Sequence, residues 1–308
     1  MKCTKCRRRQ AVYLRSYSGE MLCRFCFKRS LEVKVKNTIS KYRLLSHNDS
    51  ILIAVSGGKD SLTLLKTLWR IESRIPSVTL AVLTIDEGAT RSYRAEGLKL
   101  SRKICEDLKI PHYIVSFKEY VGYTLKELWS RIQEKKLELL PCSYCGVLRR
   151  RIMNTFAKDH GFTKIATGHN LDDEVQTFIM NIMRGDYSKL FRFGASMEVV
   201  PGFIPRIKPL RYIPEKEIAF YAFLEGFKLY ETECPYVHLS MRDEIRFMLN
   251  DFERRYPGIK FSIMSVMDKL SKQFSKLSKT YFKTCISCGE PTSRDKCRVC
   301  EIMDLVST

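Results

Sequence analysis

The sequence ILIAVSGGKDSLTLL, residues 51–65, decides the fold of this chain. An aliphatic run meets two glycines, Gly57 and Gly58, and apolar residues then recur at helical spacing, which predicts a strand, a tight turn and a helix. Glycines let a backbone approach a ligand closely, and the free N–H groups that open a helix favour an anion. The stretch therefore predicts a phosphate-binding loop at the end of a buried strand.

Polar side chains in the same loop suit a nucleotide phosphate. Ser56 and Ser61 offer hydroxyl groups, Lys59 offers a positive charge, and Asp60 either caps the helix or binds Mg²⁺. The spacing matches neither the GxxxxGKS/T pattern of a P-loop nor the GxGxxG pattern of a dinucleotide site. A glycine turn without a ligand would explain the two glycines alone, but it does not explain all six residues in this order.

Strands and helices alternate on both sides of this loop. Further strands are predicted at residues 80–86, 112–117 and 164–169, and helices at 31–45, 93–108, 124–136 and, after a turn at Cys142 and Cys145, up to 160. This alternation predicts an α/β fold with a parallel sheet, in which ligands bind beyond the carboxyl ends of strands. Three such ends are candidate site segments: residues 56–61, 85–88 and 168–173.

Composition and charge point to a polyanionic partner. The 308 residues are 44% hydrophobic, and 54 Lys and Arg against 34 Asp and Glu give a net charge of +20. A surplus of this size favours nucleic acid. No apolar run approaches membrane-spanning length, and the first residues lack the apolar stretch of a signal peptide, so we expect a cytoplasmic protein without a membrane partner.

Eight of the twelve cysteines form two four-cysteine patterns at the ends of the chain. Each pattern is a pair of CxxC knuckles, and segments this short need a staple to fold, so we expect two structural Zn²⁺ sites with complete ligand shells. The predicted ligands are Cys3, Cys6, Cys23 and Cys26, and Cys285, Cys288, Cys297 and Cys300. The predicted domains are zinc ribbons at 1–30 and 284–308, a catalytic domain at 31–240 and a basic helical segment at 241–283.

Three further cysteines, Cys142, Cys145 and Cys234, suggest a different site. Three thiolates with an open coordination position suit an iron–sulfur cluster with one exposed iron. A pair that cycles through a disulfide or persulfide, or a three-thiolate zinc site, remains open. The last cysteine, Cys105, falls within a helical pattern and is interpreted as a core thiol.

Two other segments have both a structural and a functional interpretation. Asp172 and Asp173 follow the second glycine turn, where they either stabilise a helix N-terminus or hold Mg²⁺ and take a proton. Between residues 262 and 282 an apolar helical stripe runs beside a lysine stripe, which is either a solvated face or a contact with RNA phosphates. The lysines are Lys269, Lys272, Lys276, Lys279 and Lys283.

Two motifs carry a family resemblance. The hexapeptide SGGKDS at 56–61 resembles the PP-loop of ATP pyrophosphatases, and GHNLDD at 168–173 resembles the corresponding segment of PP-loop enzymes that act on tRNA. Together with the order of the cysteine motifs, the whole chain resembles the tRNA 2-thiouridine synthetases of archaea, some thermophilic bacteria and the eukaryotic cytoplasm. That resemblance implies a PP-loop domain of the adenine nucleotide α-hydrolase type.

The resemblance also implies a reaction and a set of site residues. ATP and Mg²⁺ would adenylate the C2 oxygen of a tRNA uridine, and sulfur would replace it at a cluster, expected to be 4Fe-4S, on Cys142, Cys145 and Cys234, in a homodimer. Catalytic roles would also fall to Lys59, Asp60 and Asp173. The implied nucleotide-binding residues are Ala54, Ser56, Gly57, Gly58, Lys59, Asp60, Ser61, Ile85, Arg149, Gly168, His169 and Asp173.

Several alternatives stay open. Arg149 stands where some family members have a lysine, and because a guanidinium does not release its proton, we expect it to bind phosphate or the adenylate. Wobble uridine 34 is favoured over T-loop uridine 54. The sulfur donor is a thiocarboxylated ubiquitin-like protein, a desulfurase product or free sulfide. A tRNA cytidine thiolase and a non-enzymatic ATP- and RNA-binding zinc protein are the rival functions.

Overall fold

The central feature of the computed structural model is a five-stranded parallel sheet, in a chain described at residues 1–90, 94–186, 201–228, 234–274 and 282–307. The strand order β5-β4-β3-β6-β7 puts β3 in the middle, so the loop after β3 is flanked on both sides. In the register, Ile53 is paired with Val82 on one side and with Ala166 on the other. The strands are β3 (Ser50–Ala54), β4 (Thr79–Asp86), β5 (His112–Ser116), β6 (Lys164–Ala166) and β7 (Arg206–Ile207).

Both faces of the sheet are covered, which is why its strands read as continuous apolar runs. Side chains of β3 alternate between two cores: Ile51 and Ile53 lie in one and Leu52 lies in the other. The first core is formed with α1 (Arg24–Lys41), α2 (Lys59–Glu72), α3 (Ala95–Leu108) and α9 (Glu215–Leu224). The second is formed with α4 (Phe117–Val121), α5 (Leu125–Glu134), α6 (Pro141–Asp159) and α12 (Arg298–Ser307).

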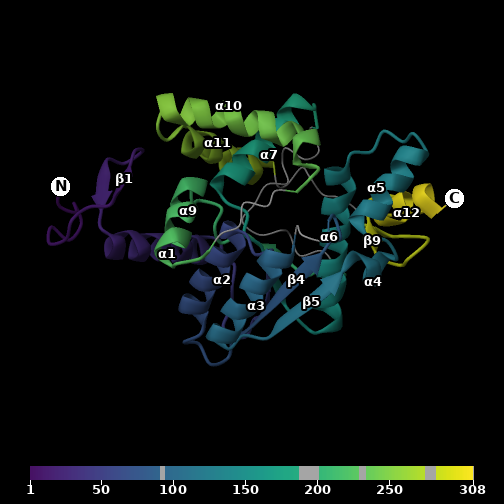
Figure 1. Cartoon of the computed structure of the whole chain (residues 1–308), viewed down its shortest axis with the longest axis horizontal. Helices are drawn as coiled ribbons and strands as arrows, with labels where there is room; N and C mark the ends of the chain where they lie inside the picture. Colours follow the sequence, from purple (N-terminus) through teal and green to yellow (C-terminus); the bar gives the residue numbers. More distant parts are fainter. Residues whose placement is uncertain (91–93, 187–200, 229–233, 275–281, 308) are drawn as a thin grey trace.

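A third apolar cluster lies above the carboxyl edge of the sheet. Helix α7 (Leu171–Met183) packs there against α10 (Met241–Arg255) and α11 (Ile259–Phe274), and Figure 1 shows this layer as a separate stack. The predicted basic helical segment is thus two helices. Lys276 and Lys279 lie outside the described residues, and Lys283 belongs to strand β8 (Lys283–Thr284), where it pairs with Asp295 at 2.8 Å. The single lysine stripe along one helix is therefore wrong for Lys283.

The N-terminal ribbon is fastened to the sheet domain by a buried ion pair. Strands β1 (Tyr13–Arg15) and β2 (Glu20–Leu22) form a hairpin, and α1 begins directly after Cys23. Arg15 donates to both carboxylate oxygens of Glu217 on α9, at 3.0 and 2.8 Å, and both side chains are almost fully buried. Helix α1 therefore starts seven residues before the predicted helix start at residue 31 and joins the ribbon to the sheet domain without a break.

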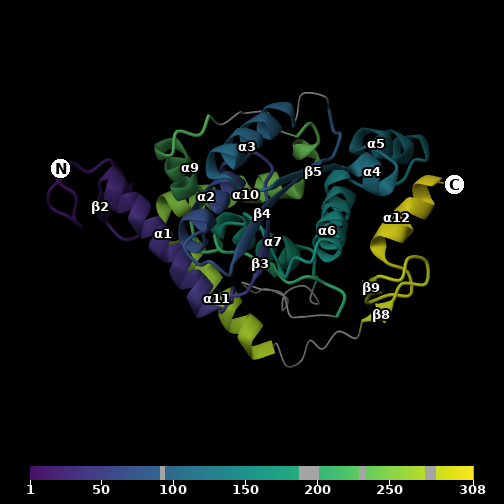
Figure 2. The ribbon, with the colours of Figure 1, turned by 90° about the horizontal axis from the view of Figure 1, so that it is seen from below.

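The C-terminal ribbon docks on the opposite side. Strand β8 pairs with β9 (Pro291–Thr292), and α12 then returns onto α5, where Arg131 Nη1 donates to the Val306 carbonyl at 2.9 Å. The two termini lie at opposite ends of the longest axis, as Figures 1 and 2 both show. A short 3₁₀ helix, η1 (Val237–Leu239), lies beside α6. In the described part of the chain, no helix has the length and apolar character needed to cross a bilayer.

Candidate active site

The loop between β3 and α2 has the close backbone packing that its glycines predict. Gly57 has a φ of +83°, and a Cβ there would lie 2.4 Å from the Cα of Gly97 on α3. Ser61 Oγ accepts a hydrogen bond from the Ser56 N–H at 3.1 Å and donates to the Gly58 carbonyl at 2.9 Å. Gly58 is the N-cap of α2 and has no side chain to occupy the first N–H groups, which stay open to an anion.

Lys59 and Asp60 at the start of α2 connect this loop to two other segments. Lys59 Nζ lies 2.7 Å from Glu215 of α9 and 3.2 Å from Asp60. Burial alone would lower the pKa of Lys59, but the carboxylates of Asp60 and Glu215 outweigh it and raise that pKa, so the lysine is charged. Asn170 Nδ2 donates to Asp60 Oδ1 at 2.7 Å, which brings the segments 56–61 and 168–173 together as predicted.

Gly168 explains how the second segment comes so close. A Cβ at this position would lie 3.1 Å from the backbone carbon of Asp60, tighter than an ordinary contact. Neighbouring parallel strands end at the same edge of a sheet, and β6 is hydrogen-bonded to β3. The strand β6 ends at Ala166, before the predicted end at residue 169, so His169 and Asn170 are free to turn toward the loop.

Asp173 has the electrostatics of a proton acceptor. Its carboxylate completes a capping box, in which it accepts from the Asn170 N–H at 3.1 Å, and Arg242 Nη1 lies 3.6 Å away. Burial and then the charge of Asp60 raise the pKa of Asp173 to about 6, while Arg242 opposes that rise. A carboxylate tuned toward neutrality beside a nucleotide loop is a candidate acid–base group.

Asp172 has a structural role instead. It is buried, accepts a hydrogen bond from the Glu215 N–H at 2.7 Å and forms an ion pair with Lys260 of α11. These contacts fix the start of α9, on which Glu215 reaches Lys59. The helix-terminus interpretation of this aspartate is therefore the better one, and the paired carboxylates have different tasks.

His169 is a neutral side chain among cations. Its Nδ1 lies 2.9 Å from Thr167 Oγ1, and its ring is accessible to solvent. Desolvation by the surrounding protein lowers the pKa of His169, and the charges of Lys208, Arg242 and Arg149 lower it further. Each of these cations also pairs with a carboxylate: Lys208 with Glu174, Arg242 with Asp173 and Arg149 with Glu87.

A buried carboxylate, Glu87, links the loop to helix α6. Arg94 grips it through two hydrogen bonds of 2.6 and 2.7 Å and also donates to the Ser56 carbonyl at 3.1 Å. Arg149 Nη1 lies 3.3 Å from the same carboxylate. Burial would raise the pKa of Glu87, but Arg94 and Arg149 outweigh it and lower that pKa, so Glu87 is ionised. Ile85 is buried in β4, just before this residue.

Two of the three central cysteines lie at the start of α6, and the segment that follows the third, Cys234, approaches them. The prediction of a turn before this helix is wrong, because Cys142 and Cys145 lie inside its first turns after Pro141, which is favoured at a helix start. Cys142 is exposed, Cys145 is buried, and Cys142 Sγ lies 3.9 Å from the Tyr236 carbonyl two residues after Cys234. The charge of Cys234 raises the pKa of both other thiols, after burial as the larger cause.

The spacing of these sulfurs differs from that of a single-ion site. Among the described residues, only the two terminal groups have ligand atoms that all lie within 4.8 Å of one another. The three central sulfurs do not all lie within that distance of one another, which suits ligands of different irons in one cluster better than ligands of one zinc ion. Burial raises the pKa of the Cys145 thiol, and Arg149, one turn after it, opposes that rise.

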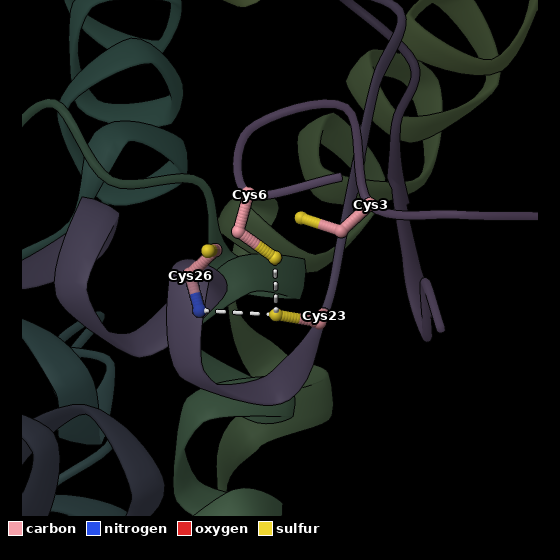
Figure 3. A group of neighbouring side chains, drawn as sticks. All are labelled: Cys3, Cys6, Cys23 and Cys26. Atoms are coloured by element: carbon pink, nitrogen blue, oxygen red, sulfur yellow. Dashed lines mark hydrogen bonds between the residues drawn. The ribbon is translucent and has the colours of Figure 1, made fainter. Parts of the chain in front are cut away.

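The terminal cysteines form compact groups. Figure 3 shows the sulfurs of Cys3, Cys6, Cys23 and Cys26 drawn together, with Cys6 and Cys23 sulfurs 3.9 Å apart. In the C-terminal group the sulfur separations are 3.9 Å for Cys285 and Cys300 and 3.6 Å for Cys288 and Cys297. Tetrahedral zinc with metal–sulfur bonds of about 2.3 Å requires about 3.8 Å between sulfurs. Both predicted four-cysteine sets are confirmed as possible metal sites.

Three functional side chains could not be found from the sequence: Glu87, Arg94 and Arg242. Glu87 lies in one of the predicted strand ends, but nothing in the order of residues shows that it is buried between two arginines. Arg242 is the second residue of α10, sixty-nine residues after Asp173, and it also donates to Thr177 Oγ1 at 2.9 Å. Only the packing of α10 on α7 brings it to the site.

Comparisons with known proteins agree with this geometry. A family profile for the PP-loop domain matches residues 27–252. The tRNA 2-thiolation protein NcsA of Haloferax volcanii is 35% identical over 99% of this chain and 99% of its own length. The tRNA-5-methyluridine(54) 2-sulfurtransferase of Pyrococcus horikoshii is also 35% identical, over 99% of this chain and 94% of its own.

A solved structure is similar over the full length. The U34-tRNA thiolase NcsA from Methanococcus maripaludis, determined with its 4Fe-4S cluster, superposes with a TM-score of 0.84 at 33% identity. The similarity covers 100% of this chain and 97% of that one. The match therefore includes both ribbons as well as the sheet domain.

Proposed function

This chain belongs to the tRNA 2-thiolation proteins of the PP-loop family and is a sulfurtransferase, and from that membership we propose that it uses ATP to convert a tRNA uridine to 2-thiouridine. One observation carries the proposal. A continuous chain of contacts runs from the Ser56 carbonyl through Arg94, Glu87 and Arg149 toward the Cys145 thiol. This chain of contacts supports our proposal that the nucleotide loop and the three-cysteine group act as one site.

The first step is adenylation of the base. The uridine C2 oxygen attacks the α-phosphorus of ATP, the bond to pyrophosphate breaks, and the N3 proton leaves. The open N–H groups of α2 and the charged Lys59 stabilise the pyrophosphate, and Mg²⁺ would be held by Asp60. Asp173, with its raised pKa, accepts the proton.

The second step exchanges oxygen for sulfur. Hydrosulfide adds to C2, the C2–O bond breaks, AMP leaves, and the sulfur-borne proton ends on N3. Cys142, Cys145 and Cys234 are the residues that would hold an iron–sulfur cluster, which supplies an exposed iron for the incoming sulfur. Arg149 lies beside Cys145 and Glu87, where it binds the adenylate phosphate and favours an anionic sulfur.

The terminal groups complete the proposed protein. Their sulfur separations and complete Cys₄ shells suit structural Zn²⁺ with no position left for a substrate. We further propose a cytoplasmic homodimer that takes its sulfur from a thiocarboxylated ubiquitin-like protein, a desulfurase product or free sulfide. Anaerobic assays with each donor separate these sources.

The favoured target is wobble uridine 34. The full-length structural match to a U34-tRNA thiolase supports it. A specific observation also favours uridine 54 as the second candidate, because the similar Pyrococcus horikoshii protein bears that position in its name. The two targets lie in different arms of tRNA, so a position-specific product analysis decides between them.

The test is anaerobic thiolation of an unmodified tRNA transcript with ATP, Mg²⁺ and sulfide, read by mass spectrometry of nuclease fragments. We expect 2-thiouridine in the anticodon fragment, none without ATP, and none from the Cys142→Ala/Cys145→Ala/Cys234→Ala variant. Matched transcripts with cytidine at position 34 or 54 serve as controls. Thiolation that persists in the triple variant, or that appears on a cytidine, contradicts the proposal.

A further inference from the structure

A basic groove with an exposed aromatic ring lies where α1 meets α9, beside the N-terminal four-cysteine group. These helices are neighbours in Figure 1 and share the first core. The groove has a volume of about 670 Å³ and lies outside the site described above. Four cations and one carboxylate line it together with two apolar side chains: Arg24, Lys28, Arg29, Arg70, Glu32, Phe25 and Leu224. We call it the ribbon groove.

Phe25 gives the ribbon groove a stacking surface. Its side chain is 56% exposed although it follows a buried cysteine by only two residues, and the Arg9 guanidinium lies 5.0 Å from its ring centroid. A ring held by a guanidinium and open on another side is the arrangement on which an unpaired base stacks. Phe223 on α9, 70% exposed, adds a second open ring on the neighbouring helix.

The cations of the ribbon groove divide into two kinds. Lys28 and Arg70 both pair with Glu225, the C-cap residue of α9, and these ion pairs hold α1 and α2 against the end of α9. Arg24 and Arg29 are exposed and form no ion pair with any residue in the described part of the chain. Unpaired guanidiniums on a rigid helix are suited to phosphate groups, because phosphate accepts two parallel hydrogen bonds from one guanidinium.

The ribbon groove is also held at a fixed position relative to the nucleotide loop. Arg15 of the ribbon grips Glu217 on α9, and Glu215, on the same helix, lies 2.7 Å from Lys59. A ligand bound at the ribbon is therefore oriented with respect to the active site through one short helix. A large substrate that binds at both places needs such a fixed orientation between them.

We propose that the ribbon groove binds an unpaired segment of the substrate tRNA, with a base stacked on Phe25 and phosphates held by Arg24 and Arg29. This inference rests on the proposed tRNA substrate and names a surface for it. The combination of open rings with unpaired guanidiniums favours RNA over an acidic protein, which would not need a stacking platform. Binding of the sulfur-donor protein or of a second copy of this chain is an outcome of the test.

The test measures binding of a fluorescent, unmodified tRNA transcript to the full-length protein across a salt series, without ATP or sulfide. Phe25→Ala should weaken binding about tenfold, the expected cost of one lost base stack. Arg24→Gln/Arg29→Gln should weaken binding at low salt and reduce the slope of log K against log salt by about two, one for each lost phosphate contact. Zinc content and melting temperature should not change, because all three side chains are exposed.

A matched control carries the same kinds of change on α4. Tyr120→Ala/Lys118→Gln also removes one exposed ring and one exposed cation, although Lys118 is paired with Glu127 at 3.0 Å, and this variant should bind tRNA as the wild type does. Equal affinity and salt slope in all variants would overturn the proposal. So would an unchanged tRNA affinity together with lost self-association or lost donor binding. Because no thiolation is read, a protein that binds tRNA through the groove but makes no 2-thiouridine would reject only the proposed function.

Discussion

The terminal and central cysteine groups use the same side chain in opposite ways. Each terminal group is assembled from two short knuckles, and its sulfurs all lie within 4.8 Å of one another. The central group combines two cysteines in the first turns of α6 with Cys234, keeps Cys142 exposed, and does not have all three sulfurs within 4.8 Å of one another. A closed set stabilises a fold, whereas an open set leaves room for a reacting atom.

The two groups also differ in what surrounds the thiols. Within a terminal group the thiols differ: backbone N–H groups, that of Cys297 foremost, lower the pKa of Cys285 to about 6, whereas burial and the neighbouring sulfurs raise the pKa of Cys300. Burial raises the pKa of Cys145 to about 11, and only Arg149 works against it. The central group therefore depends on a neighbouring side chain, supplied by the same network that reaches the nucleotide loop.

The largest expected effect on thiolation comes from a change in the central cysteine group. Cys145→Ala should reduce thiolation by at least about a thousandfold, because the reaction loses the site that delivers sulfur. Zinc content and the melting temperature should stay close to those of the wild type, since Cys145 contributes little to the fold beyond a small buried side chain. Product analysis of tRNA and metal analysis of the same sample check both parts. Residual activity above a tenth of the wild-type rate would contradict a role of the central group in the reaction.

Asp173→Asn should have the next largest effect. Loss of a positioned proton acceptor costs about a hundredfold or more. The wild-type rate should rise with pH through about 6, because the carboxylate accepts a proton only when it is ionised, and the variant should lose this rise. The measurement is the pH profile of single-turnover thiolation. Asp172→Asn does not serve as a control, because Asp172 is buried against Lys260. The conservative Asp173→Glu, which restores the carboxylate, should recover part of the rate and the pH dependence.

Cys285→Ala tests whether the C-terminal four-cysteine group has only a structural role. We expect loss of one zinc per chain and faster proteolysis of residues 282–307, since a Cys₄ segment does not keep its structure without metal. Thiolation should fall only about tenfold, because α12 packs on α6 and steadies it from outside the site. Limited proteolysis with metal analysis reads the first effect. A complete loss of activity in a folded, iron-containing variant would show that the ribbon takes part in chemistry.

Arg151→Gln should give the smallest effect, and it tests whether the C-terminal four-cysteine group can be weakened without a change in thiolation. The side chain of Arg151, on α6, donates to Cys288 Sγ at 2.8 Å and to Cys297 Sγ at 3.5 Å. Removing such an outer hydrogen bond typically costs about ten- to a hundredfold in metal affinity. Zinc should therefore transfer faster to a chelator from the C-terminal group alone, at an unchanged thiolation rate. Arg150→Gln, one residue earlier and without these contacts, is the matched control.

Features with a fixed local spacing could be predicted from the sequence. The CxxC knuckles predicted both closed groups, and SGGKDS between a strand and a helix predicted the nucleotide loop, because each depends on residues a few positions apart. The alternation of apolar runs predicted the parallel sheet for the same reason. The short strand β6 and the early start of α6 were missed, since tertiary packing decides where an element ends.

The electrostatics of the candidate active site could not be predicted from local spacing. Glu87 is a single acidic residue after a strand, and its capture by Arg94 and Arg149 depends on the approach of α3 and α6. Burial raises the pKa of Asp173, and the charge of Asp60, more than a hundred residues away in the sequence, raises it further. Such values arise from burial and long-range contacts, which a linear pattern does not contain.

Metal analysis of anaerobically purified protein tests the central claim most directly. We expect about two zinc and three to four iron per chain in the wild type, with sulfide in proportion to iron. In the Cys142→Ala/Cys145→Ala/Cys234→Ala variant, iron and its absorption band should disappear while both zinc ions remain. A wild type that takes up zinc but no iron after anaerobic reconstitution, or a variant that keeps its iron, would contradict the account.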